Sequence, residues 1–571
     1  MAIALLFSLS SCQKKVPVLS ITGEYRNSFV YQEVYSLPLK MENVADLRIT
    51  SSLEDSIQIS GLDVTFLKSG TYSISVDADS VNYHQRFDVN VSDKDDCTRI
   101  SYYQLNQRNT YHSLNPIGKQ KVLVLPIGIK GYEENETKVN LDRIKNAFKG
   151  NCDYYNVHDF YYESSYGRLD LDFVMPDCWY SCGLNPKEIQ SRGDSSYGVV
   201  PLMDDALEWF FSTYKEYRRS DFDSDRDGFI DGVFLVYSSP NYTKTDDYEK
   251  KYKVMYPGNF WALSSTSLNH QNGDIDNPVS KAYCWASFDF MDEYEKENTT
   301  DSHTFIHETG HLLGLPDYYS NYSPNFPIGV PTGGLDMMDN NIGDHNAFSK
   351  FAYGWVNPTI LDHSIRIRLS PFVATGDFLL VSSKDYNHTP FDEYFTFEFL
   401  TPEKVNQKDS QVGHQKLRFY PECGIRVFHV DSRAKDRIVG GEYTDDLESM
   451  KKVAFSNTAS ETPIYQETGN PMYQLTLIQK DIKDASKCTV LDDRKNYLHE
   501  LMYESKDPMD ALFVKGDNLD MTHGSPYLRV MPSLTNRYDS YRESASETDT
   551  FSFTMSVVDI NEDYAVLDFT F

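Results

Sequence analysis

The chain has 571 residues, more than one hydrophobic core usually organises, so three or four domains are expected. A formal net charge of −31 argues against nucleic acid and anionic membrane surfaces as partners, since both would repel it. Hydrophobic residues make up 40% and charged residues 24%, which indicates a folded soluble protein, and the 41 Tyr and 33 Phe favour β-rich packing.

The N-terminal segment, residues 1–12, resembles the signal peptide of a bacterial lipoprotein. Residues 2–12 have the sequence AIALLFSLSSC, a run too short to span a bilayer that ends at Cys12, the residue that would carry the lipid. No Lys or Arg precedes Cys12, so a general secretory signal with a chance cysteine is the alternative. Both interpretations predict an extracytoplasmic protein, either a secreted one or a cell-surface lipoprotein whose N-terminal lipid is its only membrane contact.

A short tether at 13–19 leads into the first predicted domain, residues 20–97. Hydrophobic and polar residues alternate in SIQISGLDVTFLKSGTYSISVDA (56–78) and in HQRFDVNVSD (84–93), with turn residues between the runs. This pattern predicts a small β-sandwich that resembles bacterial immunoglobulin-like modules. Nothing in it indicates a ligand, so we interpret the module as a spacer.

The largest predicted domain, residues 119–360, follows a linker at 98–118. Strand-like and helix-like runs alternate along it, which predicts an α/β or α+β core. The individual elements are a buried strand at 119–129, a helix at 140–150 closed by Gly150, a helix followed by a strand over 157–175, and a second buried strand at 231–239.

An aspartate-rich loop precedes the second buried strand. The sequence DSDRDGFID places Gly228 at loop position 6 and carboxylates at positions 1, 3, 5 and 9, which are Asp223, Asp225, Asp227 and Asp231. Oxygen ligands on alternate residues around a tight glycine turn suit Ca²⁺. The usual acidic residue at position 12 is replaced by Phe234, so further ligands must come from elsewhere. We expect a structural calcium site, because such close carboxylates repel one another without a cation; a solvated, metal-free acidic turn is the alternative.

The segment HTFIHETGHLLGLPD (303–317) has the spacing H-E-x-x-H-x-x-G-x-x-D. On a helix, His307 and His311 leave the same face one turn apart, so both imidazoles can reach one zinc ion. A bend after the helix, at Gly314, can return the carboxylate of Asp317 to the same ion. Glu308 lies too far round the helix to be a natural ligand and can instead contact a water molecule on the open side of the metal. Two exposed histidines on an ordinary amphipathic helix are the alternative.

A second motif follows in GGLDMMDNN (333–341). In metzincin-type zinc peptidases a tight turn places a methionine as an apolar floor below the zinc ligands. Gly333 and Gly334 suit such a turn, and Met337 or Met338 would be the floor residue.

The C-terminal part, residues 361–571, is β-rich and predicts one or two further β-sandwich units. The strand-like runs are DEYFTFEFL (392–400), CGIRVFHVDS (423–432), YQLTLIQKD (473–481) and TFSFTMSVVDINEDYAVLDFTF (550–571). The whole chain is therefore expected to be a multidomain α+β protein with a zincin-like catalytic domain between β-sandwich regions.

The catalytic segment resembles that of the immune inhibitor A family of bacterial secreted zinc metallopeptidases. Other stretches similar to the family are DFYYESSYGRLDL (159–171), FDSDRDGFIDGVFLVYSS (222–239), DEYFTFEF (392–399) and GIRVFHVD (424–431). The resemblance covers about 119–435 and implies a zinc endopeptidase with His307, His311 and Asp317 as ligands and Glu308 as catalytic base. Family members often have Trp-Asp-x-Met at the methionine turn, whereas this chain has Leu335-Asp336-Met337-Met338, which favours Met338 as the floor residue.

The chemistry expected of this site is hydrolysis of a peptide bond by water that zinc acidifies and Glu308 deprotonates. A second group should stabilise the developing oxyanion, and five residues compete for that role: His303, His345, Tyr318, Tyr319 and Tyr353. Two other functions fit the sequence. The protein could be a cell-surface binding protein for a glycan or protein, with a vestigial zinc site, or another zinc hydrolase that cleaves cell-wall or glycan amide bonds.

Overall fold

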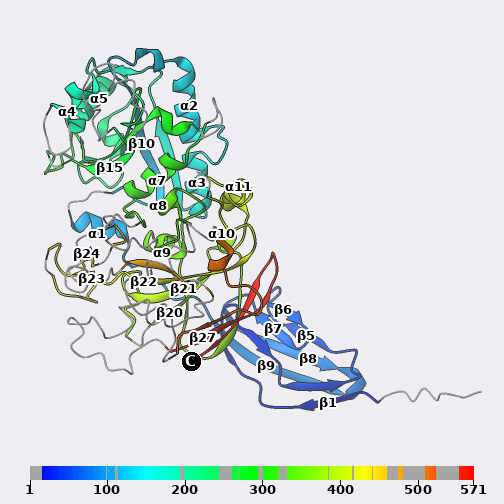
Figure 1. Cartoon of the computed structure of the whole chain (residues 1–571). Helices are drawn as coiled ribbons and strands as arrows, with labels where there is room; N and C mark the ends of the chain where they lie inside the picture. The colour runs from blue at the N-terminus through cyan, green and yellow to red at the C-terminus, as the bar shows by residue number, and fades with distance from the viewer. Residues whose placement is uncertain are drawn as a thin grey trace, which may run out of the picture. The chain divides into compact units, whose positions relative to one another are not determined.

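A computed structural model describes most of the chain as a mixed α/β protein with several sheets (Figure 1). Its contacts divide it into two units. The smaller unit comprises residues up to 94 together with 364–368 and 566–568, and the larger unit comprises the remaining residues. The described residues are 16–97, 99–109, 113–192, 198–242, 260–267, 269–292, 300–319, 331–382, 385–414, 417–439, 441–454, 456–458, 473–478, 480, 508–522 and 552–571.

The smaller unit is built from strands that are antiparallel to their neighbours, except that β2 runs parallel to β9, and they share one core. A four-stranded sheet has the order β2-β9-β8-β5 and a three-stranded sheet the order β3-β7-β6. Every second residue of β8, such as Ile74 and Val76, is buried, and both pack in one core with Val64 and Phe66 of β7. The strand bounds are β1 Val18–Ile21, β2 Ser28–Val30, β3 Val34–Ser36, β4 Leu39–Glu42, β5 Arg48–Ser51, β6 Ile57–Ser60, β7 Asp63–Phe66, β8 Gly70–Ala78 and β9 Tyr83–Ser92. The strands expected in 56–78 and 84–93 are confirmed.

The main sheet of the larger unit has the order β11-β10-β14-β17-β15. Strands β11, β10, β14 and β17 run parallel, and β15 at the edge is antiparallel to β17. Their bounds are β10 Gly118–Gly128, β11 Leu169–Val174, β14 Val233–Tyr237, β15 Leu263–Thr266 and β17 Ala282–Ser287. The predicted buried strands at 119–129 and 231–239 are confirmed as β10 and β14.

Helices cover both faces of this sheet, because its central strands are apolar on both sides. Along β10, Val122 and Val124 belong to one core, whereas Leu123 and Leu125 belong to the other. The first core contains residues of α2 (Lys138–Lys149), α3 (Val157–Ser164) and α7 (His303–Leu312), and the second contains residues of α5 (Val199–Thr213). This layering seats α7 against β17 and β15, near the edge of the sheet.

A second sheet in the larger unit has the order β18-β20-β21-β22-β25. Its bounds are β18 Thr359–Leu361, β20 Phe378–Ser382, β21 Glu393–Leu400, β22 Gly424–Asp431 and β25 Leu475–Ile478. The buried guanidinium group of Arg426 pairs with Glu398 at 2.8 Å and donates to the main-chain oxygen of Leu335 at 3.2 Å. This contact ties the second sheet to the segment that follows α7. The strands predicted from 392–400 and 423–432 are confirmed.

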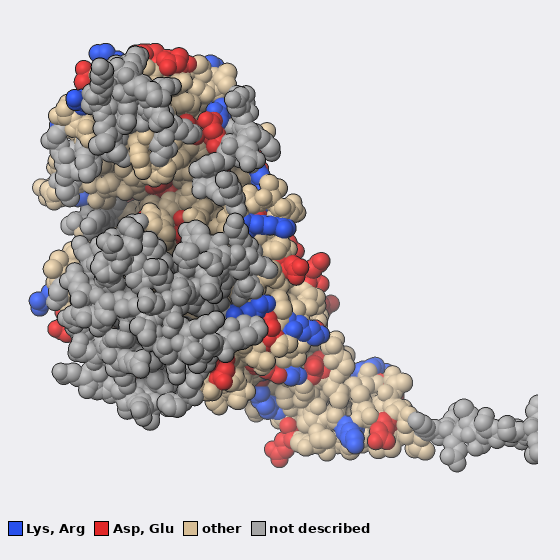
Figure 2. All heavy atoms as spheres, viewed as in Figure 1, with Lys and Arg blue, Asp and Glu red and all other residues tan. Residues whose placement is uncertain are grey.

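The remaining elements are short. They are α1 Tyr102–Arg108, α4 Pro186–Gln190, α8 Met337–Asn340, α9 Ala347–Ala352, α10 Phe372–Thr375, α11 Gln407–Gln411, β12 Tyr180–Ser181, β13 Phe229–Ile230, β16 Val279–Ser280, β19 Ile365–Leu369, β23 Ala434–Lys435, β24 Lys452–Val453, β26 Asn518–Asp520, β27 Thr554–Ile560 and β28 Ala565–Thr570. Within the described ranges no helix is long and apolar enough to cross a membrane. Acidic and basic side chains are interspersed over the face that Figure 2 shows.

Candidate functional site

Helix α7 carries the predicted zinc motif and is buried along nearly its whole length. It ends with a reversal in which Gly314 N donates to His311 O at 2.9 Å and Leu315 N donates to Gly310 O at 3.1 Å. Gly314 has φ +107, in the region that side chains with a Cβ atom rarely adopt, so the expected glycine bend is confirmed. The bend carries the chain back towards the helix at Asp317.

The side chains of His307, His311 and Asp317 converge. Oδ1 of Asp317 lies 3.0 Å from Nε2 of His307 and 3.1 Å from Nε2 of His311. The other ring nitrogen of each histidine donates to a main-chain oxygen at 2.8 Å, that of Met337 for His307 and that of Leu315 for His311. Because a carbonyl oxygen only accepts, these bonds place a proton on each Nδ1, and Nε2, which faces the Asp317 carboxylate, is the nitrogen of each ring that can bind a metal.

The carboxylate of Glu308 lies beside this group and is buried. The residue is 4% exposed, and its Oε2 has no hydrogen-bond partner among the described residues. Burial raises the pKa of Glu308, although the nearby histidines act against that rise. For Asp317 the balance is reversed: burial would raise its pKa, but His307 and His311 hold it well below its ordinary value. Neighbouring carboxylates with opposite pKa shifts suit different roles.

The methionine turn lies against α7. An added Cβ atom at Gly310 would stand 2.4 Å from Sδ of Met338, so this glycine allows the thioether to approach the helix between the two histidines. The main-chain oxygen of Met338 also accepts from Tyr318 N at 2.7 Å. Asp336 caps α8 through the bond from Met338 N at 2.9 Å. The turn therefore contacts both helix α7 and the chain that returns Asp317.

A cavity of about 1240 Å³ opens onto these side chains. One wall is α7, with Thr304, His307, Glu308 and His311, and another is the edge strand β15. The wall also includes Asp301, Asp317, Tyr319 and His414. The cavity is large enough for a segment of a polymer rather than only a small metabolite.

The structure separates the five candidates for an oxyanion stabiliser. His345, Tyr318 and Tyr353 are fully buried, and their polar atoms bond to Tyr161, Ser349 and the main chain of Gly310, respectively. Both ring nitrogens of His303 face carboxylates. Tyr319 alone among the five lines the cavity, where burial and the nearby Asp317 carboxylate raise the pKa of its hydroxyl.

Sequence reasoning missed His414, which lines the same cavity as Asp301. It comes from a segment far along the chain, just after α11, with no motif around it. A pattern of spacing detects only residues that one local element brings together, so no signal within the single sequence identifies this histidine.

The aspartate-rich loop brings together three of its four predicted ligands. Oxygen atoms of Asp223, Asp225 and Asp231 lie within 4.8 Å of one another. The side chain of Asp227 lies outside this group and accepts from Phe229 N at 2.9 Å. Burial raises the pKa of Asp231 to about 7. Gly228 has φ +86 and packs against the main chain of Asp274, 2.5 Å from where a Cβ atom would be.

The lipidation residue Cys12 lies outside the described residues. No model of a protein family matches this chain. No curated protein matches it either. The resemblance to the immune inhibitor A family therefore stays a prediction that depends on the residues named above.

Proposed function

We propose that the protein is an exported, lipid-anchored zinc endopeptidase with a zincin-like catalytic domain preceded by an immunoglobulin-like module. The observation that carries the proposal is the convergence of His307, His311 and Asp317 at the wall of a large cavity, with Glu308 beside them. The domain boundaries, the β-sandwich form of the terminal regions and the membership of the immune inhibitor A family belong to the same proposal.

The donor set fits zinc. Two neutral imidazoles and one carboxylate are ligands that catalytic zinc prefers, with a fourth position left for water or substrate. In a tetrahedral site with bonds of about 2.05 Å, neighbouring ligand atoms are about 3.3 Å apart. The Nε2 atoms lie 3.0 and 3.1 Å from Oδ1 of Asp317, close to that spacing. The main-chain oxygens that accept from each Nδ1 fix the orientation of both rings.

Zinc, when bound, supplies a Lewis acid that acidifies water and polarises a carbonyl group. Glu308 would take a proton at its unpartnered Oε2 and return it to the leaving amine. Burial raises its pKa above the ordinary value of a glutamate, which strengthens it as a base. Tyr319, on the cavity wall, would donate its hydroxyl proton to the developing oxyanion.

The edge strand β15 favours a peptide over a glycan. It ends the main sheet, and its residues Leu263, Ser264, Ser265 and Thr266 line the same cavity as Glu308. An edge strand offers main-chain donors and acceptors to an extended peptide, which can pair as an additional strand. A binding protein without activity would not need the buried carboxylate of Glu308, whose burial is costly.

A structural calcium ion at Asp223, Asp225 and Asp231 is the second part of the proposal. Asp231 is 7% exposed and receives a hydrogen bond from Ser224 N at 2.8 Å. Three carboxylates so close together favour a divalent cation.

The decisive experiment compares casein cleavage by wild-type protein, by E308A and by wild-type protein treated with a chelator. We expect E308A and the metal-free protein to lose activity at least ~1000-fold, since a base and a metal each supply several kcal/mol. E308A should still bind one zinc ion per chain. Cleavage that persists in both preparations would exclude this site as the catalytic centre. Release of acetate from a glycan, or of a peptide from a cell-wall glycan, without casein cleavage would favour the other hydrolase.

A further inference from the structure

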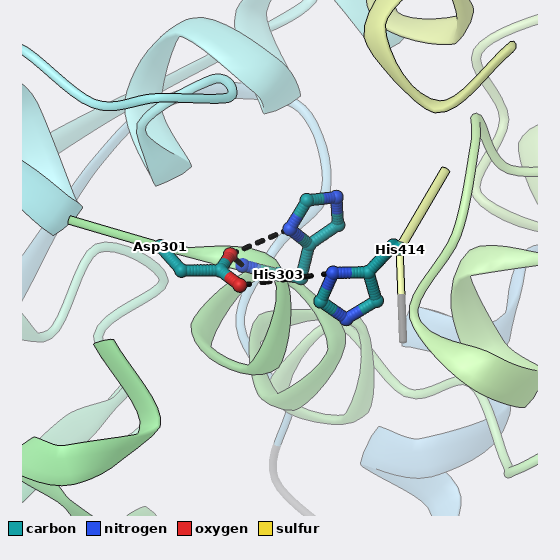
Figure 3. A group of neighbouring side chains, drawn as sticks. All are labelled: Asp301, His303 and His414. Atoms are coloured by element: carbon teal, nitrogen blue, oxygen red, sulfur yellow. Dashed lines mark hydrogen bonds and ion pairs between the residues drawn. The ribbon is translucent and has the colours of Figure 1, made fainter. Parts of the chain in front are cut away.

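A second group of buried titratable side chains lies at the N-terminal end of α7 (Figure 3). Nδ1 of His303 lies 2.5 Å from Oδ1 of Asp301, and its Nε2 lies 3.2 Å from Oδ1 of Asp409. Carboxylates only accept, so both ring nitrogens carry a proton and His303 is an imidazolium ion. Burial acts to lower the pKa of His303, but the two carboxylates outweigh it and raise the pKa to about 10.

The ring of His414 completes the group. It stacks on the His303 ring, with centroids 3.9 Å apart and planes at 20°, and Tyr154 stacks on the same ring at 4.0 Å. Two rings this close to a third must lie on its opposite faces. Nδ1 of His414 faces Oδ2 of Asp301 at 3.7 Å (Figure 3).

The stacking argues against a second metal ion in this group. The lone pairs of an imidazole lie in the plane of its ring, so nearly parallel stacked rings direct them side by side rather than to one point. At the other end of α7 the rings of His307 and His311 are almost perpendicular, at 88°, and their Nε2 atoms approach one carboxylate oxygen. The group around His303 therefore has the geometry of a charged cluster.

His414 itself is neutral and has one nitrogen free. Its side chain is 8% exposed, and Nε2 is buried at the cavity wall without a hydrogen-bond partner among the described residues. Burial, together with the positive charge of His303, lowers the pKa of His414 to about 4. The Asp301 carboxylate favours a proton on Nδ1, which leaves the lone pair of Nε2 as an acceptor.

The group also has an excess of negative charge. Two carboxylates and one imidazolium leave one net negative charge behind the neutral ring of His414. Lys408 also acts on His414 electrostatically, but its ammonium group bonds to the main-chain oxygen of Asp153 and is not part of the cavity wall. The described residues that line the cavity include six carboxylates and no Lys or Arg: Asp289, Asp292, Asp301, Glu308, Asp317 and Asp339.

We propose that the cluster of Asp301, His303, His414 and Asp409 forms a substrate subsite that recognises the cationic side chain of a Lys or Arg residue. An N–H donor of that side chain bonds to Nε2 of His414, and the net negative charge favours its positive charge. This proposal rests on the proposed peptidase function and assigns it a substrate class. A buried acceptor that has no partner among the described residues gains a bond when such a substrate binds.

The test begins with the zinc-loaded wild-type protein and denatured casein. Mass spectrometry of the products maps the cleavage sites, and we expect Lys and Arg to be enriched at one position near the scissile bond. Synthetic peptides built on one such site then carry Lys, norleucine or Glu at that position. We expect kcat/KM for the Lys peptide to exceed that for norleucine about tenfold, as a charge-assisted hydrogen bond allows.

Variants then assign the preference to the subsite. H414F keeps a ring for the stack and removes both nitrogens, so the Lys/norleucine ratio should fall to near one whatever the absolute rates. H414Q keeps a polar acceptor and should retain an intermediate ratio, and H363F, at an exposed site, serves as the matched control with an unchanged ratio.

Three outcomes would overturn the proposal: no position with a preference for Lys or Arg in the wild type, an unchanged ratio in both His414 variants, or a second zinc ion per chain that H414F removes. The first needs no variant, so it decides the matter even if H414F does not fold. Failure of the proposed function looks different, because the zinc-loaded protein would then cleave no peptide at all. Cleavage without a cationic preference rejects the subsite alone.

Discussion

The same kinds of side chain, histidine and aspartate, meet at the two ends of α7 in two different arrangements. At one end His307 and His311 meet Asp317 at a single oxygen, and each ring is fixed by a main-chain acceptor. At the other end His303 and His414 stack, and each faces a carboxylate. Residue type alone therefore does not define a metal site. What distinguishes the two groups is the direction of the imidazole lone pairs. Lone pairs that point to one place favour a metal ion, whereas the lone pairs of stacked rings favour protons.

The largest effect expected from this comparison is on zinc content. H307A should retain less than about 0.2 zinc ions per chain and lose activity at least ~1000-fold, because the site then has two protein ligands instead of three. H303A should retain close to one zinc ion. Its cost is in stability, about 3–5 kcal/mol, because two buried carboxylates lose their cation. Metal analysis after dialysis measures the zinc content, and urea denaturation measures the free energy of unfolding.

The distinction between the two groups would be wrong if H303A and H307A had the same zinc content. A folded H303A protein that has lost its zinc would place His303 among the ligands, and an H307A protein that keeps its zinc would remove His307 from them.

A smaller effect is expected at the contact between Gly310 and Met338. Alanine is ordinarily about 1 kcal/mol better than glycine inside a helix. Here its Cβ atom would lie 2.4 Å from Sδ of Met338, so we expect G310A to be destabilised by about 1–3 kcal/mol. M338A opens the space, and the double variant should recover part of the loss, with a coupling energy of about 0.5–3 kcal/mol.

Urea denaturation of the four proteins in this cycle measures the coupling. Additive effects would show that the methionine is not the floor of the helix at this point, and a G310A protein as stable as the wild type would show that the thioether moves away at little cost.

The sequence predicted those features of the fold and the site that neighbouring residues determine. It missed those that depend on tertiary packing. The four-residue spacing of His307 and His311 is a property of any α-helix, and Gly314 marks the bend that returns Asp317. The strands β10 and β14 follow from continuous apolar runs that two layers of helices must cover. In contrast, His414 joins the cavity through tertiary packing alone. The role of His303 was left open because its two carboxylate partners, Asp301 and Asp409, determine its charge, and Asp409 is distant in the sequence.

The last effect concerns the group of Asp223, Asp225 and Asp231, which contains carboxylates and no histidine. The quantity expected to change is the stability that calcium adds. Burial raises the pKa of Asp231 from 3.8 to about 7. Without calcium, the folded protein keeps a proton that the unfolded chain releases, so this group's contribution to stability is present below pH 3.8 and is lost as the pH rises through about 7. Calcium binds the ionised form, so the stabilisation it gives should grow over the same range and reach about 1–3 kcal/mol at pH 8 with calcium well above its Kd.

Melting temperatures with and without calcium, at pH 5.5 and pH 8, test this sign. A larger calcium effect at pH 5.5 than at pH 8, or none at either, would reject the site. The loop supplies its own matched pair of variants. D223N removes a member of the converging group and should abolish the effect, whereas D227N changes a carboxylate that lies outside the group and should keep most of it. Equal losses in both variants would mean that the calcium-bound loop follows the regular alternate spacing of the sequence, with Asp227 turned inwards, rather than the arrangement of three aspartates described above.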